Sequence, residues 1–345
     1  MTSARSTFEH QPSPFANCLA LNTTLPQNNM EGHAQRLAVL IAFGVLARQF
    51  WRKANRISNE KGRVAVVTGA AGGVGKEAVL QLVEQGWQVF ACDVDANGLE
   101  KAAFPKTQVT TITFDIRRPD QCQALVDQVS QATNGRLDAL LNIAGVVQPG
   151  PIMGFSEEQI KFVYEVNTFG PMRLCSLFIP LLIKGRFGGS IINLASIGSK
   201  IAWPWSGNYS ATKAALLSFS DALRRESLAN ALPLRVSVVA PGPIKTPMAH
   251  LFTERMNAWV AGNEANPFFP ACSTEAKFQQ RLKDQGFDQD VVAVLPEVVA
   301  AKCIDLLDDL DPDAFCLVYN WAFSLLYNAC WYLPTRLGDR LLIAF

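Results

Sequence analysis

The sequence predicts an α/β fold: a single doubly wound domain with a parallel sheet, plus an N-terminal apolar segment and a C-terminal aromatic-rich extension. Three observations predict it. Apolar strand patterns alternate with helix patterns from Gly62 to about Leu310 without a linker, as in one doubly wound sheet. The strands are continuous runs of Val, Ile and Leu, which suit a parallel sheet covered on both faces. A glycine-rich turn follows the first strand and leads into a helix.

The elements fall in a regular order along the chain. We expect strands at 64–68, 88–92, 109–115, 139–143, 190–194, 234–240 and 314–318, with helices at 76–84 and 209–228. The predicted organisation is an N-terminal extension (1–61), a central domain (62–313) and a C-terminal extension (314–345). Residues 1–35 are polar with few periodic apolar positions, so we expect this part to be poorly ordered.

The glycine-rich turn predicts a nucleotide site. Residues 63–75 read Arg-Val-Ala-Val-Val-Thr-Gly-Ala-Ala-Gly-Gly-Val-Gly, a strand that passes into a turn and then a helix. Gly69 permits the turn, Gly73 lets the backbone approach a pyrophosphate, and Gly75 allows close packing of helix on strand. The free amides at the helix start then face the anion. The flanking strand and helix favour a dinucleotide over a chance cluster of glycines.

The second strand leads to Asp93, eighteen residues after Gly75, where a dinucleotide ribose is expected. A carboxylate there binds both ribose hydroxyls and repels the 2′-phosphate of NADP. At about 4 Å and an effective dielectric near 20, this repulsion is roughly 4 kcal/mol. The turn offers no basic side chain for that phosphate, so we expect NAD rather than NADP. The alternative is that Asp93 only caps the next helix while Asp95 faces solvent.

Tyr209, Lys213 and Ser196 supply groups for proton transfer. Tyr209 and Lys213 are four residues apart, and Ser196 lies thirteen residues before Tyr209. In a helix this spacing places the phenol and the ammonium on one face, where the cation favours the phenolate. Taken alone, the spacing is more typical of an exposed helix face with a solvated lysine than of a catalytic pair. The glycine turn and Asp93, at ordered positions upstream, favour the catalytic interpretation.

These motifs and their order resemble the short-chain dehydrogenase/reductase family from about Gly62 to Leu310, with its Rossmann-type domain. The segment 68–75 resembles the family's cofactor turn, Asp115-Ile116 the dipeptide that contacts the adenine, and 241–246 the loop that meets the nicotinamide end. The run Leu141-Asn142-Ile143-Ala144-Gly145 matches the Asn-Asn-Ala-Gly strand end except at Ile143, a change that can loosen a backbone hydrogen bond but removes no catalytic group. The cofactor residues implied by the resemblance are Thr68, Gly69, Gly73, Val74, Gly75, Asp93, Asp115, Ile116, Asn142, Ala144, Gly145, Tyr209, Lys213, Pro241, Gly242, Ile244 and Thr246.

The resemblance also implies a catalytic tetrad of Asn167, Ser196, Tyr209 and Lys213. Tyr209 is the expected general acid or base while a hydride passes to or from the nicotinamide. Lys213 lowers the tyrosine pKa and binds the ribose, Ser196 donates to the reacting oxygen, and Asn167 holds a water that links Lys213 to solvent. The expected protein is therefore an NAD-dependent oxidoreductase acting on CH–OH groups. The alternatives are an NADPH-dependent carbonyl reductase and a catalytically silent NAD-binding regulatory protein.

The substrate and the location are predicted from the extensions. In layout the chain resembles the hydroxysteroid and retinol dehydrogenase branches, so we expect a lipophilic steroid-, retinoid- or long-chain-like alcohol or ketone. Residues 249–295 are the expected lid, with aromatics such as Phe252 and Trp259 over an apolar ligand. The apolar run 37–47 is too short to span a bilayer comfortably. Within a candidate helix 37–51, it is a signal-anchor, an interfacial helix or a helix docked on the body.

Charge and terminal composition set the expected partners. Basic residues after the apolar run place the catalytic domain on the cytosolic side if the segment binds a membrane, and the alternative is a cytoplasmic protein. The aromatic residues of 315–333 suit contact with a membrane surface or an oligomer interface. Long helices of this family often pair, so we expect a homo-oligomer. The formal net charge of +1 gives no indication of nucleic acid.

Cysteine and histidine spacing predicts no metal site. The eight cysteines form no Cys-x-x-Cys motif and no zinc-like spacing, and the three histidines are far apart in the sequence. The cysteines are therefore interpreted as small core residues of a protein in a reducing compartment.

Overall fold

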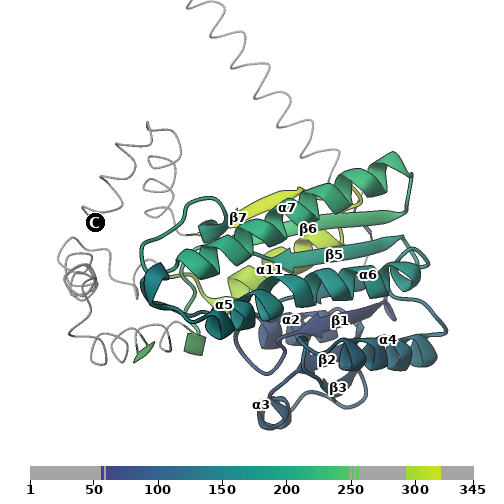
Figure 1. Cartoon of the computed structure of the whole chain (residues 1–345). Helices are drawn as coiled ribbons and strands as arrows, with labels where there is room; N and C mark the ends of the chain where they lie inside the picture. Colours follow the sequence, from purple (N-terminus) through teal and green to yellow (C-terminus); the bar gives the residue numbers. More distant parts are fainter. Residues whose placement is uncertain (1–55, 58–59, 249–250, 252–253, 256–292, 320–345) are drawn as a thin grey trace, which may run out of the picture. The chain divides into compact units, whose positions relative to one another are not determined.

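Seven parallel strands form one sheet in the order β3-β2-β1-β4-β5-β6-β7 (Figure 1). The structure is a computed structural model that describes residues 56–57, 60–248, 251, 254–255 and 293–319. The strands are β1 (Val64–Thr68), β2 (Gln88–Asp93), β3 (Val109–Thr113), β4 (Ala139–Asn142), β5 (Gly189–Leu194), β6 (Leu234–Pro241) and β7 (Phe315–Val318). The predicted doubly wound fold is confirmed. The candidate helix 37–51, the aromatic residues after 319 and nearly all of the lid lie outside the described residues.

Helices cover both faces of the sheet (Figure 1). One face packs against α2 (Gly73–Glu84), α3 (Ala96–Lys101) and α11 (Pro296–Leu307). The other packs against α4 (Pro119–Thr133), α6 (Gly170–Leu182) and α7 (Gly207–Ala229). Four further helical segments lie in the described part: η3 (Ile152–Gly154), α5 (Glu157–Tyr164), the π-helical turn η4 (Glu165–Phe169) and η5 (Ile197–Ser199). Such two-sided cover explains why the strands are continuously apolar.

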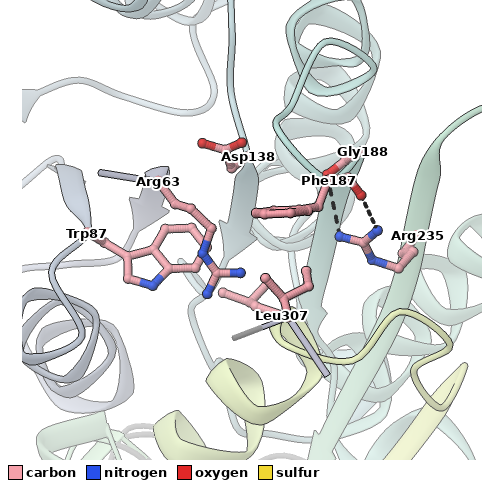
Figure 2. Close-up of a pocket in the computed structure, with 8 residues that line it drawn as sticks. Arg63, Trp87, Asp138, Phe187, Gly188, Arg235 and Leu307 are labelled. Carbon is pink, nitrogen blue, oxygen red and sulfur yellow. Dashed lines mark hydrogen bonds between the residues drawn. The ribbon is translucent and has the colours of Figure 1, made fainter. Parts of the chain in front are cut away.

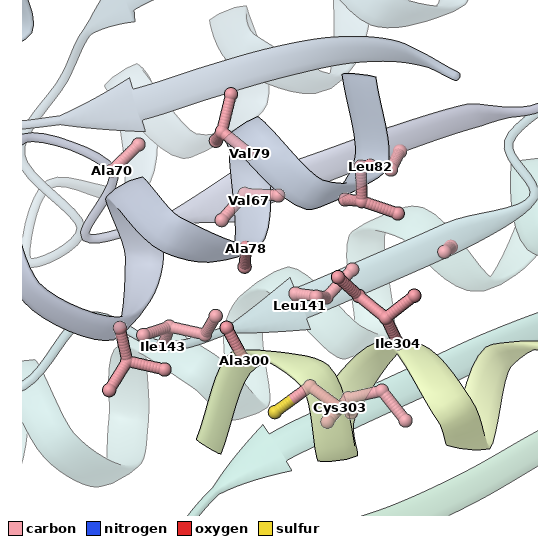
Figure 3. Packing of buried hydrophobic residues seen from close by; sticks show 14 of the residues in the cluster. Val67, Ala70, Ala78, Val79, Leu82, Leu141, Ile143, Ala300, Cys303 and Ile304 are labelled. Carbon is pink, nitrogen blue, oxygen red and sulfur yellow. The ribbon is translucent and has the colours of Figure 1, made fainter. Parts of the chain in front are cut away.

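The core beneath α2 and α11 consists of interlocking aliphatic side chains (Figure 3). Val67 and Leu141 point from β1 and β4 toward Leu82 of α2 and Ile304 of α11, and all four are buried. Burying one such side chain contributes about 1.5–3 kcal/mol. Cys303 belongs to the same cluster, and burial raises the pKa of its thiol to about 12. The five described cysteines are all buried, as expected of core residues.

The last strand corrects a predicted domain boundary. β7 pairs in parallel with β6, so Phe315–Val318 belongs to the sheet and not to a separate extension beginning at 314. At the other end, the amide of Ile57 donates to the carbonyl oxygen of Asp308 at 2.8 Å. The domain therefore extends beyond both predicted limits, 62 and 313. Pairing across a sheet, and not local sequence, decides where such a domain ends.

A buried charged cluster lies at the amino ends of the strands (Figure 2). The guanidinium of Arg63 stacks on Trp87 at 3.8 Å and pairs with Asp308, and the three side chains are buried. Arg235 donates to the carbonyl oxygen of Phe187 at 2.7 Å. Burial, and then the charge of Arg63, lower the pKa of Arg235. This cluster joins the beginning of the domain to α11 at the edge opposite the predicted active site.

Candidate active site

The carboxyl ends of β1 and β4 form the point at which the strand order reverses. Thr68 and Asn142 are register partners there, and the chain continues to β2 on one side and to β5 on the other. Ligands of doubly wound proteins bind at such a switch point. A Cβ atom at Gly69 would lie 2.8 Å from the main chain of Ala144, so the turn after β1 lies directly against the segment after β4.

The glycine-rich turn has the geometry expected of a phosphate cradle. Gly69 and Gly73 have φ angles of +73° and +52°, which favour glycine. A Cβ atom at Gly75 would overlap the carbonyl oxygen of Gly69. α2 begins at Gly73, and no side chain caps its first turn, so its amide groups face outward for an anion. The methyl of Thr246 lies 3.3 Å from a Cβ atom built at Gly73, which places the loop after β6 beside the turn.

Thr68 fixes the neighbouring strand end. Its buried hydroxyl accepts hydrogen bonds from the amides of Ile143 and Ala144, both at 3.1 Å. The replacement of asparagine by isoleucine at 143 therefore leaves these main-chain bonds in place. Val74 is buried in α2, where it supports the turn through packing.

Asp93 faces the glycine-rich turn. One carboxylate oxygen accepts from the amide of Ala71 and the other from the amide of Asp95, each at 3.0 Å. The cap of α3 is Asp95, which accepts from the amide of Gly98 at 3.0 Å. The alternative in which Asp93 caps that helix is therefore wrong. The structure places Asp93 at the end of β2 beside the turn, as the ribose interpretation requires.

Three other predicted cofactor residues have side chains engaged within the protein. Asp115 forms a bidentate pair with Arg117, with distances of 2.9 and 2.6 Å, and this pair holds the pKa of Asp115 below its usual value. Ile116 is buried. The buried Nδ2 of Asn142 donates to Asn193 at 2.8 Å, while its Oδ1 is buried without a hydrogen-bond partner among the described residues.

Ser196, Tyr209 and Lys213 converge at the same edge. Ser196 follows β5, and its hydroxyl accepts from the amide of Gly198 at 3.1 Å. Nζ of Lys213 donates to the carbonyl oxygen of Leu194 at 2.7 Å and lies 5.8 Å from the centroid of the Tyr209 ring. The i,i+4 spacing in α7 thus brings the two side chains together, as predicted.

The electrostatics of this group differ from the sequence-based expectation. Burial raises the pKa of Tyr209, and a hydrogen bond with Ser196 opposes this in part. Burial also lowers the pKa of Lys213 to about 8. The expectation that the cation lowers the tyrosine pKa overlooked the desolvation of the phenolate, which is the larger effect here. At neutral pH the phenol keeps its proton and most of Lys213 remains an ammonium.

Asn167 lies in the π-helical turn η4, next to Lys213. Its Oδ1 accepts from the amide of Val146 at 2.8 Å, and its Nδ2 donates to the carbonyl oxygen of Val146 at 2.9 Å and to Oγ1 of Thr212 at 3.1 Å. A Cβ atom at Gly145 would lie 3.4 Å from both Oδ1 of Asn167 and Nζ of Lys213. The side-chain amide is thus engaged, and a water held by Asn167 would have to use its main-chain carbonyl. Thr212, which the sequence interpretation missed, is signalled only by its place between Tyr209 and Lys213.

The loop after β6 completes the site. β6 ends at Pro241, and the amide of Gly242 donates to the carbonyl oxygen of Val318 at 2.9 Å. Ile244 forms an isolated bridge with Val294. Among the residues that the structure describes, no His, Cys, Asp and Glu side chains gather as a metal site, and no helix is long and apolar enough to cross a membrane.

Comparisons with known proteins agree with this geometry. A family model described as short chain dehydrogenase matches residues 63–257. The 3-oxoacyl-[acyl-carrier-protein] reductase FabG of Thermotoga maritima is 31% identical over 199 residues, which cover 56% of this chain and 79% of that protein. A short chain dehydrogenase/reductase from Burkholderia phymatum in complex with NAD has a TM-score of 0.64 at 23% identity, covering 79% of this chain and 94% of that one. A short chain dehydrogenase from Burkholderia cenocepacia in complex with NADP has a TM-score of 0.61 at 23% identity, with 82% and 98% covered.

Proposed function

Since the chain belongs to the short-chain dehydrogenase/reductase family of NAD(P)-dependent oxidoreductases, we propose that it interconverts a hydroxyl and a carbonyl group with Tyr209 as the general acid and base. The convergence of Ser196, Tyr209 and Lys213 beside the glycine-rich turn carries this proposal. When bound, the nicotinamide of the cofactor supplies or accepts the hydride. The protein then has to move one proton and stabilise one developing negative charge.

The proton passes through the phenol of Tyr209. In carbonyl reduction the phenol donates its proton to the oxygen of the substrate, and the hydroxyl of Ser196 donates a hydrogen bond to the same oxygen. The raised pKa of Tyr209 keeps the phenol protonated for this step. The ammonium of Lys213, 5.8 Å from the ring centroid, then stabilises the phenolate that remains. Oxidation of an alcohol uses the same groups in reverse.

The residues of the switch point fit a dinucleotide, and we propose NAD as the preferred one. The cradle at Gly73 and the uncapped start of α2 suit a pyrophosphate. Beside them, the fixed charge of Asp93 opposes a 2′-phosphate. Main-chain groups of Gly145, Gly242 and the loop through Thr246 would surround the remaining half of the cofactor.

The proposed substrate is a lipophilic alcohol or ketone of steroid, retinoid or long-chain type. Support comes from an apolar cluster that follows Ser196, in which Ile197 and Ile201 are buried against Trp203, Leu317 and Tyr319. The sequence features of 37–51 support membrane association of the protein, and the exposed rings of Phe162 and Phe169 support a homo-oligomer.

The first test is Tyr209→Phe, assayed with NADH and NADPH against steroid, retinoid and long-chain alcohols and ketones. We expect turnover to fall by about 10²–10⁴-fold because the proton donor is lost. Cofactor affinity, measured by nicotinamide fluorescence, should change by less than about fivefold, since one hydroxyl is worth only about 1 kcal/mol. Equal turnover in the variant would refute the assigned role. Tight NADH binding by the wild type with no turnover would instead favour the regulatory alternative.

A further inference from the structure

Thr212 joins the two helical segments that carry the predicted tetrad. It is fully buried in α7, between Tyr209 and Lys213. Its hydroxyl donates to the carbonyl oxygen of Tyr209 at 2.6 Å and accepts from Nδ2 of Asn167 at 3.1 Å. A second bond runs the same way, because the hydroxyl of Thr168 donates to the carbonyl oxygen of Thr212 at 3.1 Å. Hydrogen bonds thus connect α7 and η4 at the positions of the predicted tetrad residues.

The connection continues to the cofactor side of the site. Asn167 binds both main-chain groups of Val146, at 2.8 and 2.9 Å. The preceding residue, Gly145, has no side chain, and a Cβ atom there would lie 3.4 Å from Nζ of Lys213. The hydroxyl of Thr212 therefore fixes the amide of Asn167 together with the main chain of Val146, and that amide holds the strand end beside Lys213. Among the described residues, Thr212 makes its hydrogen bonds with Asn167, Thr168 and the main chain of Tyr209, and none of them reaches a reacting group directly.

We propose that Thr212 is a positioning residue, which acts through Asn167 and the main chain of Tyr209 to set the placement of the phenol relative to Lys213. This proposal rests on the proposed function. Displacements of about 1 Å in a catalytic group can cost about 10²-fold in rate, so one hydrogen bond can matter more to turnover than to folding. The hydroxyl, and not the shape of the side chain, is the required feature.

The test compares three variants of the full chain. Thr212→Val keeps the shape and removes the hydroxyl, while Thr212→Ser keeps the hydroxyl. Ser220→Ala is the matched control, because Ser220 is also buried in α7, accepts from Nδ2 of Asn193 at 2.8 Å and donates to the carbonyl oxygen of Leu216 at 2.7 Å. It lies eleven residues from Tyr209, or roughly 16 Å along the helix.

The first readout is reduction of isatin, a cyclic α-keto amide, with saturating cofactor. For Thr212→Val we expect kcat to fall about 10–100-fold, with the dissociation constant of NADH within about twofold of the wild type. Thr212→Ser should restore kcat to within about threefold of the wild type, and Ser220→Ala should keep it there. Unchanged kcat in Thr212→Val, or an equal loss in Thr212→Ser or Ser220→Ala, would overturn the proposal.

The second readout needs no turnover. Tyrosinate absorbance, taken as the difference between each protein and its Tyr209→Phe counterpart, gives the apparent pKa of Tyr209. The groups that face the phenol among the described residues are Ser196 and Lys213. We expect an upward shift in Thr212→Val alone, because a displaced phenol loses part of the hydrogen bond with Ser196 that lowers its pKa. A wild type that fails to reduce isatin or any panel substrate, while this shift is present, would count against the proposed function and support the positioning role. No shift would overturn that role.

Discussion

Asp93 has two roles: it carries a negative charge beside the predicted ribose site, and it accepts hydrogen bonds that hold the main chain. Two substitutions distinguish these roles. Its carboxylate accepts from the amides of Ala71 and Asp95, each at 3.0 Å, and so holds the glycine-rich turn and the start of α3. The same carboxylate is the negative charge that a 2′-phosphate would meet. Asp93→Asn keeps an oxygen acceptor but removes the charge. Asp93→Ala removes both.

The magnitude follows from the position of the carboxylate. Two negative unit charges about 4 Å apart repel each other by roughly 4 kcal/mol at an effective dielectric near 20. Asp93 is half-buried, and salt screens part of its field, so about 2 kcal/mol is expected at physiological salt. This corresponds to a roughly 30-fold smaller preference for NADH over NADPH in both variants. Both variants should also lower the free energy of unfolding: Asp93→Asn by about 1 kcal/mol, because one of the two backbone amides loses its acceptor, and Asp93→Ala by about 1–2 kcal/mol, because both do.

Nicotinamide fluorescence titrations at low and high salt measure the ratio of the dissociation constants of NADPH and NADH, and urea unfolding measures the free energy of unfolding. The change in ratio for Asp93→Asn should shrink as salt is raised, because it is electrostatic. A ratio that stays within about threefold of the wild type in both variants would show that another residue reads the ribose. A change seen only in Asp93→Ala would assign selectivity to the shape of the turn and not to charge.

Three other predictions address the turn, the charged cluster and the buried lysine. Gly75→Ala should abolish NADH binding in fluorescence titrations because its Cβ would overlap a main-chain carbonyl, whereas Gly72→Ala, with open space around that position, should bind within about threefold of the wild type. Arg63→Leu should lower the free energy of unfolding in urea by about 3–5 kcal/mol, because the buried carboxylate of Asp308 keeps only the longer ion pair with Arg56, at 4.0 Å. Restoration of stability by the double variant with Asp308→Leu would confirm this cause, and a loss below about 1 kcal/mol would contradict it. Burial lowers the pKa of Lys213 in the folded protein from 10.5 to about 8, so between these pH values the unfolded chain binds more protons than the folded one. The free energy of unfolding should therefore rise with pH across that window, by roughly 3 kcal/mol relative to Lys213→Met. A free-energy difference between wild type and Lys213→Met that does not change with pH would contradict the pKa shift.

The sequence was sufficient for the sheet because its strands are continuous apolar runs between turn residues. Each of the seven predicted strands is present, with bounds that differ by no more than two residues. The largest difference is in the third strand, predicted to reach Asp115 but ending at Thr113, where Asp115 instead pairs with Arg117. The domain limits were less predictable. They depend on β7 joining β6 and on Ile57 meeting Asp308, which are contacts between segments far apart in the chain.

The features of the candidate site that depend on the spacing of residues in the sequence were predictable. Those that depend on how deeply a side chain is buried were less so. The four-residue interval of Tyr209 and Lys213 becomes a shared helix face, as expected. The direction of the tyrosine pKa shift was not predictable, because it depends on how much protein surrounds the phenol. The π-helical turn at Asn167 carries no sequence signature in this chain. Thr212 becomes important only once that turn brings Asn167 against it.

The pairing of Arg63 with Asp308 has a consequence for synthesis of the chain. The two residues are 245 positions apart, so at about 5–20 residues per second the partner of Arg63 emerges roughly 10–50 s after it. Throughout that interval the nascent domain lacks the carboxylate that pairs with Arg63 in the folded protein, and the face of α2 that later contacts α11 remains uncovered. The core beneath α2 is therefore completed only when the last helix has been made. We expect a ribosome-bound chain that ends before α11 to recruit chaperones, and one that includes α11 and β7 to release them.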